Sequence, residues 1–141
     1  MIDLEVLKRK SVQVEHALAR IKEKLSPSAD AFQEDYDSQD IVFRNFQIAV
    51  QNLMDMGNHV IAERSWQIPK TTGETFDILA SHKMITPALR TNMRGLVTLR
   101  NIIVHDYTRI DHRKAFLAIQ QSLKSIPHFC IALTEGGKEH G

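Results

Sequence analysis

Apolar residues recur every three or four positions along five stretches of the chain, which is the spacing that places them on one face of an α-helix. The first stretch covers about six helical turns, with an N-cap candidate at Asp3 and a stop at Ser26-Pro27. Its 3.5-residue period suits either a helix in a bundle or the seam of a helix–helix dimer. The positions on this face are Leu4, Leu7, Ser11, Val14, Leu18, Ile21 and Leu25, all apolar except Ser11.

The second stretch predicts a long helix over residues 38–64. Its stripe contains Gly57, and a glycine there lets another backbone come close at a cost of about 1 kcal/mol in helix propensity. The preceding residues, 28–37, are acidic and aperiodic, so we expect a loop there. The stripe residues are Val42, Phe46, Ala49, Val50, Leu53, Met56, Val60 and Ile61.

Three shorter apolar patterns predict the remaining helices. The run Thr71-Thr72-Gly73-Glu74 fits a capping box before a short third helix that ends near Lys83. Thr86-Pro87 supplies a cap and a first-turn proline for a fourth helix, which contains Gly95, a second candidate for close packing. Asp111 caps a fifth helix, and Pro127 inside that helix predicts a kink.

The alternation typical of strands is absent, and no repeat has the spacing of a solenoid. The prediction is therefore an all-α, up-and-down bundle of about five helices. At 141 residues the chain is long enough for one domain with a real core. We expect that domain to cover residues 1–135 and to be followed by a polar, flexible tail at 136–141.

The composition is that of an ordinary soluble domain, with 43% apolar and 25% charged residues. No apolar run approaches the roughly 20 residues that span a membrane. The start of the chain shows no basic region followed by an apolar core, so we expect no secretory signal. Cys130 is the single cysteine, which excludes a disulfide within the chain. These features favour a cytoplasmic protein.

Charge is unevenly distributed along the chain, although the formal net charge is only +1. Residues 30–55 hold six acids and one base, whereas residues 82–114 hold seven bases and two acids. The basic half points modestly to an anionic ligand, and a solvated surface of mixed charge explains the same counts about equally well.

The basic half contains the most informative stretch, Leu99-Arg100-Asn101-Ile102-Ile103-Val104-His105-Asp106-Tyr107. Arg100 lies eleven positions after Leu89, about 20° away around the helical wheel, so it falls within the apolar stripe of the fourth helix. A guanidinium keeps its proton and is rarely buried without a partner. Either an anion meets Arg100 in the stripe, or the stripe opens into a site there.

Arg100 and His105 together have the minimum chemistry for cutting RNA without a metal. Arginine grips a phosphate and stabilises the phosphorane, and histidine moves a proton to or from a 2′-hydroxyl near neutral pH. The structural alternative has Arg100 paired with an acid inside the bundle and His105 capping the helix. In that alternative, Tyr107 is an aromatic at the core edge with a solvated hydroxyl.

No metal or cofactor motif accompanies this stretch. The sequence has no P-loop, no CxxC and no HExxH, and none of its seven histidines forms a recognised metal spacing. A ligand pair of His105 and His112 would need support that the sequence does not supply. We therefore expect no metal and no other cofactor.

The stretch resembles the R-x4-H-x-Y signature of the HepT-like ribonucleases, a branch of the HEPN superfamily. Arg100, His105 and Tyr107 occupy the three signature positions, and Asn101 matches the polar residue that often follows the arginine. Two upstream blocks, 51–61 and 69–79, also look like recurrent blocks of this family. The resemblance covers the chain from about Ser38 to Ile119.

This resemblance implies the toxin of a toxin–antitoxin pair, a metal-independent endoribonuclease that forms a homodimer with two motifs facing one cleft. Arg100 and His105 would be catalytic, with Asn101 or Asp106 assisting. The antitoxin would be a minimal, MntA-like nucleotidyltransferase that transfers AMP from ATP to Tyr107. Some HEPN relatives have lost catalysis, so a non-catalytic helical module that docks a nucleotidyltransferase is the alternative.

Overall fold

The computed structural model describes residues 3–140, and the side chains of residues 3–136. This part of the chain is helical with no strand, as predicted, and forms six α-helices and one 3₁₀ helix. None of these helices combines the length and the apolar character that crossing a bilayer requires. The elements are α1 (Leu4–Lys24), α2 (Ala29–Glu34), α3 (Tyr36–Glu63), α4 (Glu74–Ser81), α5 (Pro87–His105), η1 (Tyr107–Arg109) and α6 (His112–His140).

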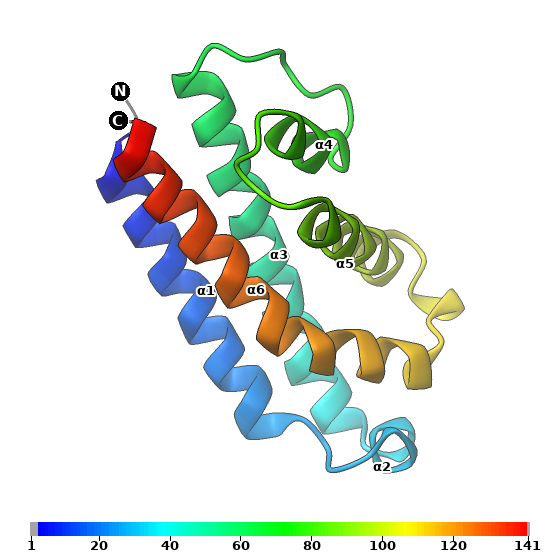
Figure 1. Cartoon of the computed structure of the whole chain (residues 1–141). Helices are drawn as coiled ribbons and strands as arrows, with labels where there is room; N and C mark the ends of the chain where they lie inside the picture. Colours follow the sequence, from blue (N-terminus) through cyan, green and yellow to red (C-terminus); the bar gives the residue numbers. More distant parts are fainter. Residues whose placement is uncertain (1–2, 141) are drawn as a thin grey trace.

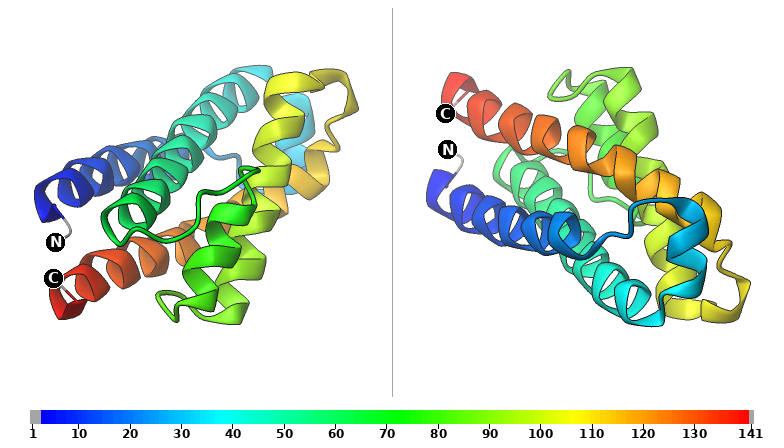
Figure 2. Two further views of the ribbon diagram at one scale, coloured as in Figure 1. Left: turned by 90° about the horizontal axis from the view of Figure 1, so that it is seen from above. Right: turned by 90° about the horizontal axis from the view of Figure 1, so that it is seen from below.

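The long helix α3 forms the centre of the bundle and packs against each of the other five α-helices. In Figure 1, α1 and α6 run beside it as long rods, and α4 and α5 lie together on another side. Figure 2 shows that α1 begins and α6 ends at the same end of the molecule. The core is rich in large side chains that are fully buried, including Phe46, Phe76, Phe129, Leu53 and Met56.

The regular apolar face of α1 is buried inside the chain's own bundle. Leu7, Val14, Leu18 and Ile21 on this face are all buried, and α1 packs against α3 and α6. Of the two uses that its period allowed, the bundle is the one observed. Asp3 caps α1 as predicted, and its carboxylate accepts a hydrogen bond from the Glu5 N–H at 3.0 Å.

The expected loop at residues 28–37 is wrong, because Ala29–Glu34 forms the short helix α2. The Ser28 hydroxyl caps α2 by accepting from the Ala31 N–H, and Phe32 is fully buried against Phe43 and Phe116. A single buried residue in a six-residue helix leaves no periodic signal, although its burial stabilises the helix on the bundle.

The predicted starts of α5 and α6 are confirmed, whereas α4 begins at Glu74 with Gly73 as its N-cap and no side-chain cap, later than the expected capping box at Thr71. Thr86 caps α5 by accepting from the Leu89 N–H at 3.1 Å, with Pro87 in the first turn. The Asp111 carboxylate accepts from the N–H groups of Arg113 and Lys114, both at 3.1 Å, where α6 begins. Pro127 lies inside α6, which changes direction along its length in Figure 1.

The last helix continues past the point where we expected regular structure to end. α6 runs to His140, and Gly141 lies outside the described residues. A Cβ on Gly136 would lie 2.9 Å from Cε of Met84, so this part of α6 packs closely on the segment before α5. The contact explains why the helix persists beyond residue 135.

The two glycines singled out as sites of close packing have opposite surroundings. A Cβ on Gly57 would lie 2.7 Å from Cγ2 of the buried Thr75 and 3.1 Å from Leu79, so Gly57 does let α4 approach α3 closely. No atom lies within 4 Å of the same position on Gly95, which is exposed. The expectation for Gly95 is therefore wrong, because this glycine faces an open hollow between α5 and α6 and not a closely packed neighbour.

These surroundings predict opposite effects of adding one methyl group. Gly57→Ala should lower the free energy of unfolding by up to about 2 kcal/mol, because overpacking costs about 1–3 kcal/mol and alanine's helix propensity offsets about 1. Gly95→Ala should raise it by about 0.5–1 kcal/mol. Urea unfolding of both variants checks this, and equal shifts would contradict the assigned packing.

Candidate functional site

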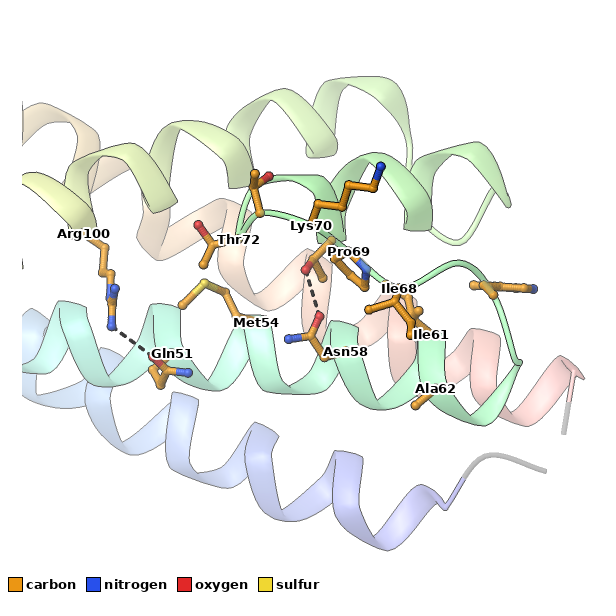
Figure 3. Close-up of a pocket in the computed structure, with 13 residues that line it drawn as sticks. Gln51, Met54, Asn58, Ile61, Ala62, Ile68, Pro69, Lys70, Thr72 and Arg100 are labelled. Carbon is orange, nitrogen blue, oxygen red and sulfur yellow. Dashed lines mark hydrogen bonds between the residues drawn. The ribbon is translucent and has the colours of Figure 1, made fainter.

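The guanidinium of Arg100 reaches from α5 across to α3, as Figure 3 shows. Its Nη2 donates to Oε1 of Gln51 and its Nη1 donates to Oδ1 of Asn101, both at 3.1 Å. Its Nε is buried and donates to no acceptor among the described residues. A guanidinium carries five N–H groups, so three are left after these two bonds.

Arg100 also differs from the other arginines of the basic half. Among the described residues, no carboxylate lies within 4.0 Å of its guanidinium, so the alternative of an ion pair inside the bundle is wrong there. The other four arginines between residues 82 and 114 all have a carboxylate partner: Arg90 and Arg94 share Asp77, Arg109 pairs with Asp106, and Arg113 pairs with Asp30. Among the described residues, therefore, no carboxylate neutralises the positive charge of Arg100.

A chain of hydrogen bonds fixes the side chain that holds Arg100. Nε2 of Gln51 donates to Oδ1 of Asp55 at 3.0 Å, and Nζ of Lys10 donates to the other oxygen of Asp55 at 3.3 Å. Because Asp55 accepts from the amide nitrogen, the amide oxygen of Gln51 is turned toward Arg100. The chain links α1, α3 and α5.

Sequence analysis did not predict this role for Lys10, Gln51 or Asp55. Gln51 and Asp55 are four residues apart on one helical face, which is a local signal that they interact. The bond to Arg100 spans 49 positions, and no local pattern indicates it.

The structure places His105 apart from Arg100. His105 is the last residue of α5, its side chain is exposed, and it makes no hydrogen bond among the described residues, so it does not cap the helix. Five residues of helix separate the two positions by about 7.5 Å along the axis and about 140° around it. One chain therefore presents its arginine and its histidine in different directions.

The two residues after His105 form the turn that ends α5. The N–H of Asp106 donates to the carbonyl of Ile102 at 2.9 Å, and its carboxylate pairs with Arg109 at 3.3 Å across η1. Asp106 thus contacts Arg109 and not Arg100, whereas Asn101 contacts Arg100 directly.

Tyr107 lies at the core edge with 48% of its surface exposed. Its ring meets Phe43 of α3 edge-to-face, with centroids 6.2 Å apart. The ring of His112 packs on the same phenylalanine at 5.8 Å, so His112 belongs to an aromatic cluster. Among the described residues, no three His, Cys, Asp or Glu side chains gather in a way that would hold a metal ion.

Two contacts show that α5 runs antiparallel to α3 beside this site: Arg100 meets Gln51, and Tyr107 meets Phe43. Between these contacts each helix exposes one apolar side chain, Ile48 on α3 and Val104 on α5, with 37% and 41% of their surfaces accessible. We call this surface the motif face; it comprises Ile48, Gln51, Arg100, Val104 and Tyr107.

A groove of about 700 Å³ opens beside Arg100. One side is α3 from Gln51 to Ala62, and the other is the connection between α3 and α4 together with Thr75 at the start of α4. Arg100 lies at one end of the groove in Figure 3, and Lys70 is on the connecting segment.

Known proteins share the sequence pattern and the fold of this chain. The model of the family "Ribonuclease HepT-like" matches residues 14–133. The mRNA nuclease HepT of Shewanella oneidensis is 27% identical over 125 residues, which are 89% of this chain and 93% of the relative. The tRNA nuclease HepT of Aphanizomenon flos-aquae is 29% identical over 100 residues, which are 71% of this chain and 68% of the relative.

A solved structure of the tri-AMPylated Shewanella oneidensis HEPN toxin in complex with MNT antitoxin has the same fold. It is similar with a TM-score of 0.86 and 26% identity, covering 92% of this chain and 97% of that one. The family model covers most of the chain, and the all-helical fold agrees with that of the solved toxin. This chain belongs to the ribonuclease HepT-like family.

Proposed function

We propose that this chain is an endoribonuclease and the toxin of a toxin–antitoxin pair, with Arg100 and His105 as its catalytic residues. The observation that carries the proposal is the state of Arg100. Two neutral side-chain oxygens hold its guanidinium, no carboxylate of the described residues neutralises it, and three N–H groups are left to donate. Such a guanidinium binds a phosphate both through its charge and through directed hydrogen bonds.

The proposed reaction needs only these groups and the RNA. The 2′-hydroxyl oxygen attacks the adjacent phosphorus, the bond to the 5′-oxygen breaks, and the products are a 2′,3′-cyclic phosphate and a 5′-hydroxyl. His105 moves the proton of the attacking or the leaving oxygen, and Arg100 stabilises the charge that grows on the phosphorane. Asn101 positions Arg100, and Asp106 supports His105 by holding the turn through Arg109.

The motif face supports a homodimer in which two copies of the motif line one cleft. One chain turns Arg100 and His105 in different directions, so a second copy completes a site that has both groups around one phosphate. Ile48 and Val104 give this face exposed apolar surface beside Arg100, which favours burial against a partner.

We propose a minimal, MntA-like nucleotidyltransferase as the antitoxin and Tyr107 as the residue that it modifies. The phenolic oxygen bonds to the α-phosphorus of ATP, the bond to the β-phosphate breaks, pyrophosphate leaves and the phenol loses its proton. The ring is anchored on Phe43 while about half of the side chain is open to an enzyme. An attached phosphate adds negative charge beside the site and opposes the RNA backbone.

The first prediction concerns the chemistry. Cleavage of RNA should persist in EDTA and leave 2′,3′-cyclic phosphate ends. His105→Ala and Arg100→Ala should each lower the rate about 100- to 10,000-fold, the usual contribution of a positioned acid–base or charge-stabilising group. Gln51→Ala should give a smaller loss, because it frees the guanidinium without removing it.

Rates from mass-spectrometric end analysis and gel assays check this, with helical content as the folding control. Lys22→Ala removes an exposed cation on α1 and should cleave like the wild type. A requirement for a divalent metal, or full activity in both alanine variants, would reject the mechanism and favour a non-catalytic module that docks a nucleotidyltransferase.

The second prediction concerns assembly. Sedimentation at micromolar concentration should give about twice the 16.1 kDa mass of one chain. Val104→Asp should shift the protein to monomer and abolish cleavage, because it places a charge in the proposed interface. Ile131→Asp, at an isoleucine of α6 that is 60% exposed, should stay dimeric. A wild-type monomer across this range would disprove the shared cleft.

The third prediction concerns regulation. Wild-type protein incubated with the antitoxin and ATP should gain whole AMP units that map to Tyr107, with loss of cleavage. Tyr107→Phe keeps the ring and cannot accept AMP, so it should stay active and toxic when the antitoxin is co-expressed. The other tyrosine, Tyr36, is 72% exposed, and Tyr36→Phe should be silenced like the wild type. Adducts on Tyr36 alone would contradict the assignment.

A further inference from the structure

The groove beside Arg100 has the charge and lining expected of a site for an anionic, partly apolar ligand. Thirteen residues line it, and none carries a carboxylate. Two of them, Arg100 and Lys70, are cations on its two sides. The exposed apolar surface comes from Ile68 on the connection and from Ala62 on α3.

We propose that this groove binds the nucleotide next to the scissile phosphate of a single-stranded RNA. The proposal rests on the function above, which places that phosphate on Arg100. The neighbouring nucleotides are covalently joined to it, so they must continue along the surface that starts at this guanidinium. The groove is the hollow that starts there, and it follows α3 for twelve residues, from Gln51 to Ala62, a rise of about 16 Å.

The lining matches the mixed chemistry of a nucleotide. Ile68 and the partly buried Pro69 offer apolar surface to the faces of a base. Asn58 contributes an amide whose oxygen already accepts from the Thr75 hydroxyl at 2.8 Å, so its two N–H groups are available to base acceptors. Lys70 on the exposed connection supplies a cation for the next phosphate.

Trp66 closes one part of the groove and is held in place. Its indole stacks on the imidazole of His82 with ring centroids 3.8 Å apart and planes within 3° of parallel. It is also the single tryptophan of the chain. Its fluorescence therefore reports on this groove alone.

The test uses short single-stranded 2′-O-methyl oligonucleotides, which lack the attacking hydroxyl and stay intact with wild-type protein. Adding them should change Trp66 fluorescence in a saturable way. Ala62→Phe fills the groove from an exposed position, and Ile68→Ala removes an apolar wall that is 84% exposed. Each should weaken binding about 5- to 150-fold, the range for losing one base contact. Lys70→Ala should lower the slope of log K against log salt by about 0.7.

Matched controls place the same changes elsewhere on the surface: Ala19→Phe on α1, Ile131→Ala on α6 and Lys22→Ala on α1 should bind like the wild type. If the oligonucleotide binds without changing Trp66 fluorescence, or if the three groove variants bind normally, this proposal is wrong and the catalytic assignment is untouched. If Ala62→Phe changes the oligomeric state and not the affinity for RNA, the groove belongs to a protein interface and the proposal is also wrong. If cleavage needs a metal while the groove variants still weaken binding, the catalytic mechanism fails and the groove proposal stands.

Discussion

The packing of α3 against all the other α-helices is the constraint on which the site depends. A helix buried on so many sides cannot shift toward one neighbour without opening a cavity against another, and cavities in a core are costly. Gln51 is on this fixed helix, and α5 carries Arg100 to it. The direction of the guanidinium is therefore set by the packing of the bundle together with Asn101, the next residue in sequence.

The way Arg100 is held preserves its use as a cation. A carboxylate partner would fix its direction equally well and would cancel most of its charge, as the partners of Arg94 and Arg109 do. Gln51 and Asn101 offer dipoles instead, so the group is oriented and still fully charged. The carboxylate in the network, Asp55, acts one residue further away and is itself paired with Lys10.

Periodicity predicts the long helices well because their buried faces repeat over many turns. It misses α2, where Phe32 is the single buried residue of six, and it cannot say whether the space around a glycine such as Gly95 is filled. The stretch that contains Arg100 can be recognised from the sequence because its unusual feature, a charged residue within an apolar stripe, is local. Its link to Gln51 joins positions 49 residues apart and belongs to the packed structure. The pattern of one chain likewise contains no information about the second copy in the proposed dimer.

The connection between α3 and α4 has a consequence for how such a protein can diversify. The chain leaves α3 through Ser65 in the left-handed region, at φ 56°, and residues 66–69 belong to no helix before the turn that leads into α4. Surface connections tolerate changes of length that helices in a core do not. Insertions or deletions here would reshape one wall of the groove and leave the helices that orient Arg100 intact. In the proposed nuclease, the choice of RNA target could thus vary over evolutionary time without changing the residues that cut.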